Sequence, residues 1–162
     1  MTDWDRLVRE HGAAVFGTAW RILGHAADTE EVVQEVFLEA YRLRQAQPVK
    51  RWGGILRRLA AYRALDRLRQ RKSFASLNDN LVSNGEMPEE AAIGRELAER
   101  LRQLVAELPE REGAVFCLRY FEDLSYHQIA EALHISSGAV AQALHKARAK
   151  LEVLLTEAMQ EE

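Results

Sequence analysis

Residues 124–151, LSYHQIAEALHISSGAVAQALHKARAKL, restrict the fold more than any other stretch, because they encode two helices separated by a short turn. Ser125 and Gln128 have the spacing of a capping box, which predicts the start of the first helix. The LHIS sequence predicts the turn, and either Ser136 or Ser137 caps the second helix. One face of that second helix is apolar, at Val140, Leu144, Ala147 and Leu151.

This pattern is typical of two structures. In a helix-turn-helix, the second helix enters the major groove of DNA with its N-terminus first. An ordinary helical hairpin has the same apolar pattern, so the segment alone leaves both interpretations open. On either interpretation, we expect Ala141, Gln142 and Ala143 to be exposed on the second helix, and none of them is charged.

The rest of the chain is also predicted to be helical. Leu, Ala, Glu and Arg dominate a composition with 48% hydrophobic and 29% charged residues, which favours helix. Helices are expected at about 4–23, 28–45 and 50–72, the second one beginning at a capping box of Asp28 and Glu31. Four more are expected after a break, at about 93–108, 110–121, 125–133 and 136–155.

Between these two groups of helices, residues 73–92 lose the helical period and contain Ser, Asn, Gly and Pro. This composition predicts a flexible linker. The predicted fold is therefore all-α, with two small helical domains at residues 1–72 and 93–162 joined by the linker.

Charge is distributed very unevenly along the chain. The net charge is −3, but eleven of the 22 Lys and Arg residues lie between Arg42 and Lys72, where Asp66 is the only acid. That segment carries +10 and the remainder −13, an asymmetry that indicates nucleic-acid contact better than the total charge does. Within it, helix 57–72 carries +6 and could bind several phosphates, with Tyr62 able to stack on an unpaired base. A solvated basic face is the alternative.

An acidic face is expected on the preceding helix, DTEEVVQEVFLEAYR, at residues 28–42. Its exposed positions include Glu31, Gln34 and Glu35, with the apolar Leu38 among them. Such a face fits a protein partner with basic residues, and a solvated acidic face is the alternative.

Catalytic and metal sites are not indicated. The five histidines have no HExxH spacing, the single Cys117 lies in the apolar sequence AVFCLRY, and no phosphate-binding glycine loop is present. We therefore expect no enzyme activity, no metal and no cofactor. No apolar run approaches the length of a membrane span, and neither a secretory signal nor a second cysteine is found, so a cytoplasmic protein without membrane insertion is expected.

Taken together and in this order, the segments resemble the bacterial RNA polymerase sigma factors of the extracytoplasmic-function (ECF) group. Residues 28–42 are similar to the family pattern D-x-E-D-x-V-Q-E-x-F-L-x-A-Y/W. Residues 108–151 are similar to the family's sigma-4 pattern, which ends in the helix-turn-helix. The resemblance implies a sigma-2-like bundle of three to four helices at 1–72 and a sigma-4-like domain at 93–162.

The resemblance also implies roles for individual residues. Contacts with the polymerase clamp are implied for Glu31, Gln34, Glu35 and Leu38. Contacts with the promoter minus-10 element are implied for Arg57, Arg58, Tyr62, Arg63, Arg67, Arg69 and Arg71. Contacts with the minus-35 element are implied for Ser136, Ser137, Gly138, Ala141, Gln142, His145, Lys146 and Arg148.

The implied function is that of an alternative sigma factor, which binds core RNA polymerase at its clamp and flap and directs initiation at promoter DNA. An anti-sigma factor is the implied regulator, and the free chain is expected to be a monomer. The family's G-T-V-K-S-R is replaced by residues 138–143, GAVAQA, which lack its Lys and Arg, and Gly113 replaces a family Arg. These departures keep a second interpretation open, a sigma-like decoy or adaptor that binds polymerase or an anti-sigma partner but DNA only weakly.

Overall fold

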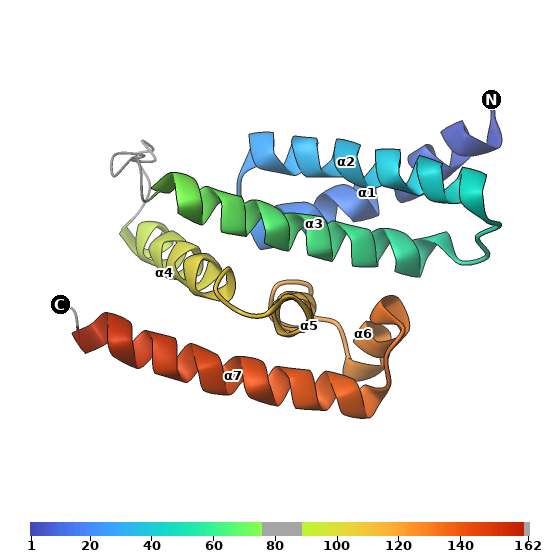
Figure 1. The fold of residues 1–162 in the computed structure, drawn as a ribbon. Coiled ribbons are helices and arrows are strands. Elements are labelled where there is room, and N and C mark those ends of the chain that lie inside the picture. The colour runs from blue at the N-terminus through green and yellow to red at the C-terminus, as the bar shows by residue number, and fades with distance from the viewer. Residues whose placement is uncertain (76–88, 161–162) are drawn as a thin grey trace.

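The protein is built from helices packed around one long central helix (Figure 1). The computed structural model describes residues 1–75 and 89–160, and the side chains of residues 1–71 and 94–160. These ranges contain no strand, which confirms the predicted all-α class. The helices are α1 (Asp3–Leu23), α2 (Ala26–Ala46), α3 (Trp52–Ala75), α4 (Glu89–Val105), α5 (Glu110–Tyr120), α6 (Tyr126–Leu133) and α7 (Ser137–Gln160).

The ends of the helices follow local capping chemistry. The capping box of Ser125 and Gln128 at the start of α6 is confirmed, with both reciprocal hydrogen bonds present. At the start of α2, the predicted capping box of Asp28 is wrong, because His25 is the N-cap and its Nδ1 accepts from the Asp28 N–H at 3.3 Å. Asp28 lies inside the first turn, where its carboxylate can reach other helices.

Helices extend into both ends of the predicted linker. α3 continues to Ala75, past the expected end at residue 72, and α4 begins at Glu89, before the expected start at residue 93. Residues 76–88, the interior of the predicted linker, lie outside the described residues.

α3 is the central helix of the fold, with α1 and α2 on one side and α5 and α6 on the other (Figure 1). The sequence pattern predicts a single apolar side on this helix, at Leu56, Leu59, Ala60, Leu65 and Leu68. The structure also buries Ala61 and Ala64 completely, so α3 is enclosed on more than one side. Small side chains at these positions let the neighbouring helices approach closely.

The two halves of the chain pack closely at Gly113 in α5. A Cβ atom at this position would lie 2.8 Å from Cδ2 of Leu65 in α3, well inside contact distance. Gly113 is a poor helix former by propensity. Because Gly113 has no side chain, α5 can pack directly against Leu65, which is fully buried.

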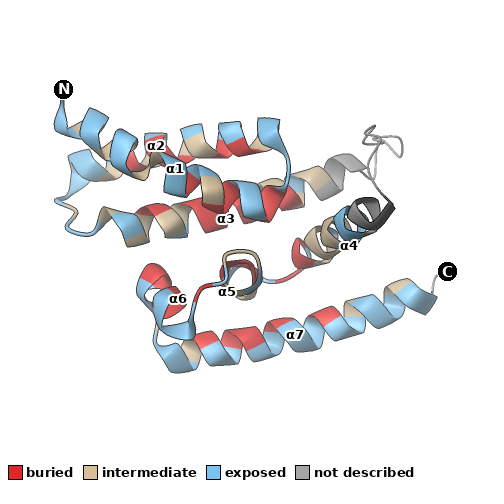
Figure 2. Ribbon diagram, turned by 180° about the vertical axis from the view of Figure 1, so that it is seen from behind, coloured by how far each residue is buried: buried red, intermediate tan, exposed pale blue. Residues whose placement is uncertain are grey.

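Buried side chains from both halves form one continuous hydrophobic core. It contains Ile22 of α1, Val36 of α2, Leu65 of α3, Leu118 of α5 and Leu144 of α7. Figure 2 shows the buried positions on the faces that the helices turn towards one another, whereas the C-terminal part of α7 is mostly exposed. The two predicted domains therefore share α3 as a common packing partner.

Polar contacts also cross from one half to the other. Nε of Arg102 in α4 donates to the Ile22 carbonyl at 2.8 Å, at the C-terminus of α1. The guanidinium of Arg21 donates twice to Oε2 of Glu122, at 3.1 and 2.8 Å, and the Glu122 side chain is only 5% exposed. Arg102 thus provides a hydrogen-bond partner for a carbonyl at the end of α1, and Arg21 provides one for a buried oxygen of Glu122. Both contacts reinforce the apolar contact with α3.

Replacing Leu65 with Ala tests the importance of this contact. Leu65→Ala should lower the free energy of unfolding by about 2–5 kcal/mol, since it leaves a cavity between α3 and α5. The control Leu97→Ala, at a position that is 64% exposed, should change it by less than about 0.5 kcal/mol. Urea denaturation followed by circular dichroism measures both, and similar losses for the two variants would contradict the central position of Leu65.

Candidate nucleic-acid interface

The turn before α7 has the geometry that a helix-turn-helix requires. α6 ends at His134, which adopts the left-handed conformation with φ 56°. The Ile135 N–H donates to the Ala130 carbonyl at 3.1 Å, and this bond closes the turn. Ser136 is the cap of α7, since its Oγ accepts from the Ala139 N–H at 3.0 Å.

The predicted apolar face of α7 is buried. The residues implied to contact the minus-35 element, which we call the reading face, are exposed. Val140, Leu144, Ala147 and Leu151 all belong to the core. The residues implied to contact the minus-35 element are all exposed: Ser136, Ser137, Gly138, Ala141, Gln142, His145, Lys146 and Arg148. The first turns of α7 thus present one continuous surface of small and polar side chains.

The expected exposure of Ala143 is wrong. Its side chain is 5% exposed and belongs to the hydrophobic core, because α7 turns this position towards the other helices. Of the three uncharged positions 141–143, only Ala141 and Gln142 are therefore exposed. A cation at position 143 of this chain would have to leave the core to reach DNA.

Arg148 is held in place by an aromatic side chain of α5. Its Nε donates to Oη of Tyr120 at 2.7 Å, and its guanidinium carbon lies 5.5 Å from the centre of the Tyr120 ring. The hydrogen bond to Tyr120 raises the pKa of Arg148. α5 therefore orients a permanent positive charge at the end of the reading face.

The arginines of α3 face the acidic side chains of α2. Nε and Nη2 of Arg63 donate to Glu39 at 3.0 and 2.8 Å, and this hydrogen bond raises the pKa of Arg63. Arg67 pairs with Glu31 and, at 3.0 Å, with Glu35. The two oppositely charged helices predicted from the sequence thus lie against each other.

Asp28 and two carbonyl groups engage the last arginines of α3. Nη2 of Arg71 donates to Asp28 at 2.7 Å, and its Nη1 donates to the Leu23 carbonyl at 3.2 Å. Nη2 of Arg69 donates to the Leu108 carbonyl at 2.6 Å. Arg63, Arg67, Arg69 and Arg71, all implied to contact the minus-10 element, are therefore engaged inside the chain.

The other implied minus-10 residues lie nearer the start of α3. Arg58 is exposed, with its guanidinium carbon 5.9 Å from the centre of the half-buried Tyr62 ring. Arg57 lines a cavity bordered by α1, the start of α3 and α6. The structure therefore divides this set of residues into the exposed Arg58 with the half-buried Tyr62 beside it, the cavity residue Arg57, and four arginines that pair internally.

The implied polymerase-binding residues are also divided. Glu31 and Glu35 pair with Arg67, although their side chains remain 59% and 42% exposed. Gln34 is exposed, and Leu38 is an exposed apolar side chain. On α2, Gln34 and Leu38 therefore form the part of the surface that internal pairing leaves most available.

Two residues with structural roles at these surfaces were missed in the sequence. Asp28 was assigned to a helix cap and instead pairs with Arg71. Tyr120 orients Arg148 from a position 28 residues earlier in the chain. Neither pairing has a local signal, because each joins residues that are distant in sequence.

The described parts of the chain contain no cluster that suits a metal ion. Within them, no group of three or more His, Cys, Asp or Glu side chains could hold a metal ion. Cys117 is completely buried, and its burial raises the pKa of the thiol to about 12. No helix in the same ranges is long and apolar enough to cross a membrane.

Comparison with known proteins identifies both halves of the chain. The family description Sigma-70 region 2 matches residues 7–74, which include most of α1 and almost all of α2 and α3. The description Sigma-70, region 4 matches residues 98–151, which include α5, α6 and the reading face of α7.

Whole-length relatives combine these two regions. The ECF RNA polymerase sigma factor SigL of Mycobacterium tuberculosis is 33% identical over 159 residues, covering 93% of this chain and 88% of SigL. The chain belongs to the ECF sigma factors. SigW of Bacillus subtilis, another ECF sigma factor, is 28% identical over 150 residues, covering 85% of this chain and 80% of SigW.

Solved structures show the same fold. CnrH, solved with the cytosolic domain of CnrY, has a TM-score of 0.55 at 23% identity and covers 95% of this chain and 88% of CnrH. RpoE of Bartonella quintana, solved with the anti-sigma factor NepR, has a TM-score of 0.54 at 15% identity, with 96% and 98% covered.

Membership of the family assigns the function. This ECF sigma factor binds core RNA polymerase and directs promoter recognition and transcription initiation. It is a regulator of transcription, as the resemblance implied. Membership of the family does not by itself assign roles to individual residues.

A matched pair of substitutions on α7 tests the orientation of its reading face. Ala143→Arg should lower the free energy of unfolding by about 2 kcal/mol or more, because it places a charge at a buried position. Ala141→Arg adds the same side chain at an exposed position and should change stability by less than about 0.5 kcal/mol. Urea denaturation measures both, and equal stability of the two variants would contradict the burial of Ala143.

The thiol of Cys117 should be inert in the folded sigma factor. With a pKa of about 12, the thiolate is scarce at pH 8. Ellman's reagent should therefore react far more slowly with the folded chain than with the chain in concentrated urea. Equal rates in the two conditions would show that Cys117 is accessible.

Proposed function

We propose that this sigma factor recognises promoters through two surfaces. One surface is exposed in the free chain, and the arginines of the other are paired with carboxylates of the same chain. Residues 1–72 contact the polymerase clamp and the minus-10 element. Residues 93–162 contact the polymerase flap and the minus-35 element. The observation that supports this division most strongly is the exposed, continuous face at the start of α7, supported from behind by the core.

The minus-35 surface reads DNA with few charged groups. Ser137 and Gln142 are exposed and can form hydrogen bonds with base edges. Lys146 and Arg148 supply positive charge one turn or more further along the helix. There they can contact phosphate groups of the DNA backbone. We infer that this helix positions the protein on DNA more than it selects the sequence.

The minus-10 surface requires an exchange of partners. In the free chain, carboxylates of α2 neutralise Arg63, Arg67 and Arg71 of α3. Phosphate groups of promoter DNA can replace these carboxylates, since Arg forms bidentate pairs with both. Because α5 and α6 also cover one side of α3, the two halves separate when the sigma factor binds polymerase and promoter together.

Contact with polymerase is assigned to the exposed part of α2. Leu38 is 53% exposed and is flanked by the polar Gln34 on the same helix. A large apolar side chain within a polar surface suits the centre of a protein interface. Glu31 and Glu35 contribute negative charge at its edge.

The remaining features follow from this role. We propose that the chain acts in the cytoplasm, without catalysis of its own, as a monomer until it binds polymerase. An anti-sigma factor is the proposed regulator, because CnrH and RpoE were each solved with a partner, the latter a named anti-sigma factor.

Run-off transcription with core polymerase on a promoter library tests the proposed function. Defined start sites that require this chain are the expected result. Binding to core polymerase without any initiation would instead support a decoy or adaptor.

A lysine at position 141 should strengthen minus-35 binding. Ala141→Lys adds a cation to the reading face, so the affinity for minus-35 DNA should rise. The slope of log affinity against log salt concentration should steepen by about one unit, because one more counterion is released on binding. Thr156→Lys is the matched control, since it lies on the same helix about 20 Å from position 141. Fluorescence anisotropy at several salt concentrations measures both, and identical salt slopes for the two variants would contradict the assigned face.

Removing Leu38 should weaken the complex with polymerase. Leu38→Ser replaces the exposed apolar side chain and should reduce affinity for core polymerase by about tenfold. Leu97→Ser, at an exposed apolar position of α4, should leave it unchanged. Surface plasmon resonance with immobilised core polymerase compares them, and equal affinities would exclude Leu38 from the interface.

A further inference from the structure

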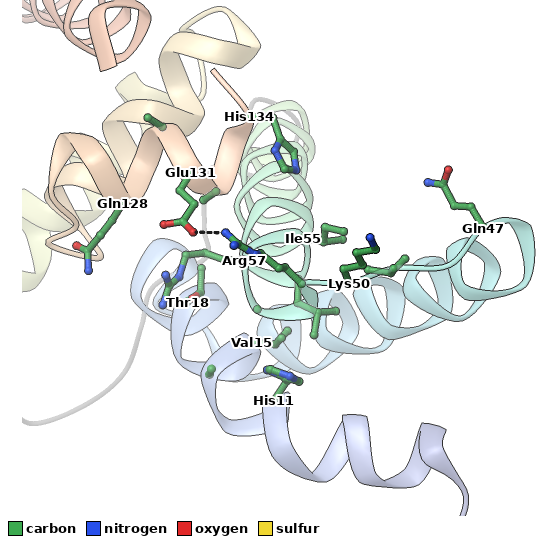
Figure 3. A pocket seen from close by; sticks show the side chains of 18 of the residues that line it. His11, Val15, Thr18, Gln47, Lys50, Ile55, Arg57, Gln128, Glu131 and His134 are labelled. Atoms are coloured by element: carbon green, nitrogen blue, oxygen red, sulfur yellow. Dashed lines mark hydrogen bonds and ion pairs between the residues drawn. The ribbon is translucent and has the colours of Figure 1, made fainter. Parts of the chain in front are cut away.

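A cavity of about 790 Å³ lies where the two halves of the chain meet (Figure 3). Its walls come from α1, from the connection between α2 and α3, from the start of α3 and from α6. This volume is within the range of sites for small organic ligands.

Positive side chains dominate the polar lining of the cavity. Lys50, Arg51 and Arg57 line it, and Glu131 is the only acid that does. Glu131 pairs with Arg51 at 3.2 Å, the dashed line in Figure 3, so Lys50 and Arg57 give the cavity a positive charge. Such a lining favours an anionic ligand.

Thr18 supplies a polar group to the lining of the cavity. Its side chain is 3% exposed and lines the cavity from α1, as Figure 3 shows, yet its hydroxyl makes no hydrogen bond within the described residues. The other buried threonine, Thr29, donates to the His25 carbonyl at 2.7 Å. The hydroxyl of Thr18 is therefore free to form a hydrogen bond with a ligand in the cavity.

The start of α3 adds backbone groups of the right polarity. The first N–H groups of a helix attract anions, and the first turn of α3 contains no acid. Gly53 and Gly54 line the cavity there, and a Cβ on either would meet no atom closer than 3.9 Å. Neither residue has a side chain that would keep a phosphate group away from this backbone.

The rest of the lining is apolar. Val15, Ile55 and Leu56 line the same cavity, with small alanines from α1 and α6. A ligand that fills it should carry an apolar or flat group in addition to its anionic group.

We propose that this cavity binds a small organic phosphate of about the size of a nucleoside monophosphate. The phosphate lies near Lys50, Arg57 and the start of α3, and the hydroxyl of Thr18 bonds to the ligand. Because α1 and α6 both contribute walls, an occupied cavity stabilises the packed arrangement of the two halves. That regulatory consequence rests on the proposed function, whereas binding itself does not.

Isothermal titration calorimetry of the full chain tests the site with AMP, adenosine and inorganic phosphate as probes. AMP should bind more tightly than adenosine or phosphate alone, since only AMP has both kinds of group. The double variant Lys50→Gln and Arg57→Gln should weaken AMP binding by about tenfold or more. Thr18→Val, which keeps the shape of the side chain, should weaken it less, and the exposed control Arg42→Gln should not change it.

Absence of AMP binding would overturn the proposal, as would equal losses in the double variant and in Arg42→Gln. Binding of a single-stranded oligonucleotide with this dependence on Lys50 and Arg57, without AMP binding, would assign the cations to DNA and overturn it as well. Run-off transcription is measured separately. Transcription without AMP binding would refute only the proposal that the cavity binds a small organic phosphate. AMP binding without transcription would refute only the proposed promoter function.

Discussion

Burial of α3 on two sides is the constraint on which the rest of the structure depends. Leu65 packs against Gly113, where a larger residue would collide with it. Each well-buried leucine of this kind stabilises a fold by about 1.5–3 kcal/mol relative to exposure. The hydrogen bond of Arg102 to the Ile22 carbonyl and the pair of Arg21 with Glu122 can form because this apolar contact brings the two halves together.

The same packing explains how a chain with net charge −3 can carry a strongly basic segment. Carboxylates of α2 lie beside the arginines of α3, so much of the positive charge of this segment is paired within the chain. Partly exposed pairs of this kind contribute little to stability, and phosphate groups can displace their carboxylates at low cost. The surface of α7 needs no such exchange, since its reading face is exposed in the free chain.

Features that depend on neighbours in sequence could be predicted, and features that depend on distant neighbours could not. The capping box of Ser125 and the apolar face that includes Val140 are local patterns, and both are present in the structure. The burial of Ala143 was missed although its spacing, three residues after Val140 and four before Ala147, places it on the apolar face of the helix. The pairing of Asp28 with Arg71 was missed because it joins residues 43 positions apart. The residue roles taken from the family resemblance stay predictions until binding is measured.

The packing of both halves on α3 is tested most directly by a distance between them in solution. Spin labels introduced with Arg42→Cys in α2 and Glu152→Cys in α7 report on it, and the buried Cys117 stays unlabelled. Pulsed electron paramagnetic resonance on the free chain should give one narrow distance distribution, which core polymerase and promoter DNA together should shift to longer distances. A broad distribution in the free chain would show that the two halves move independently, and would contradict a shared α3.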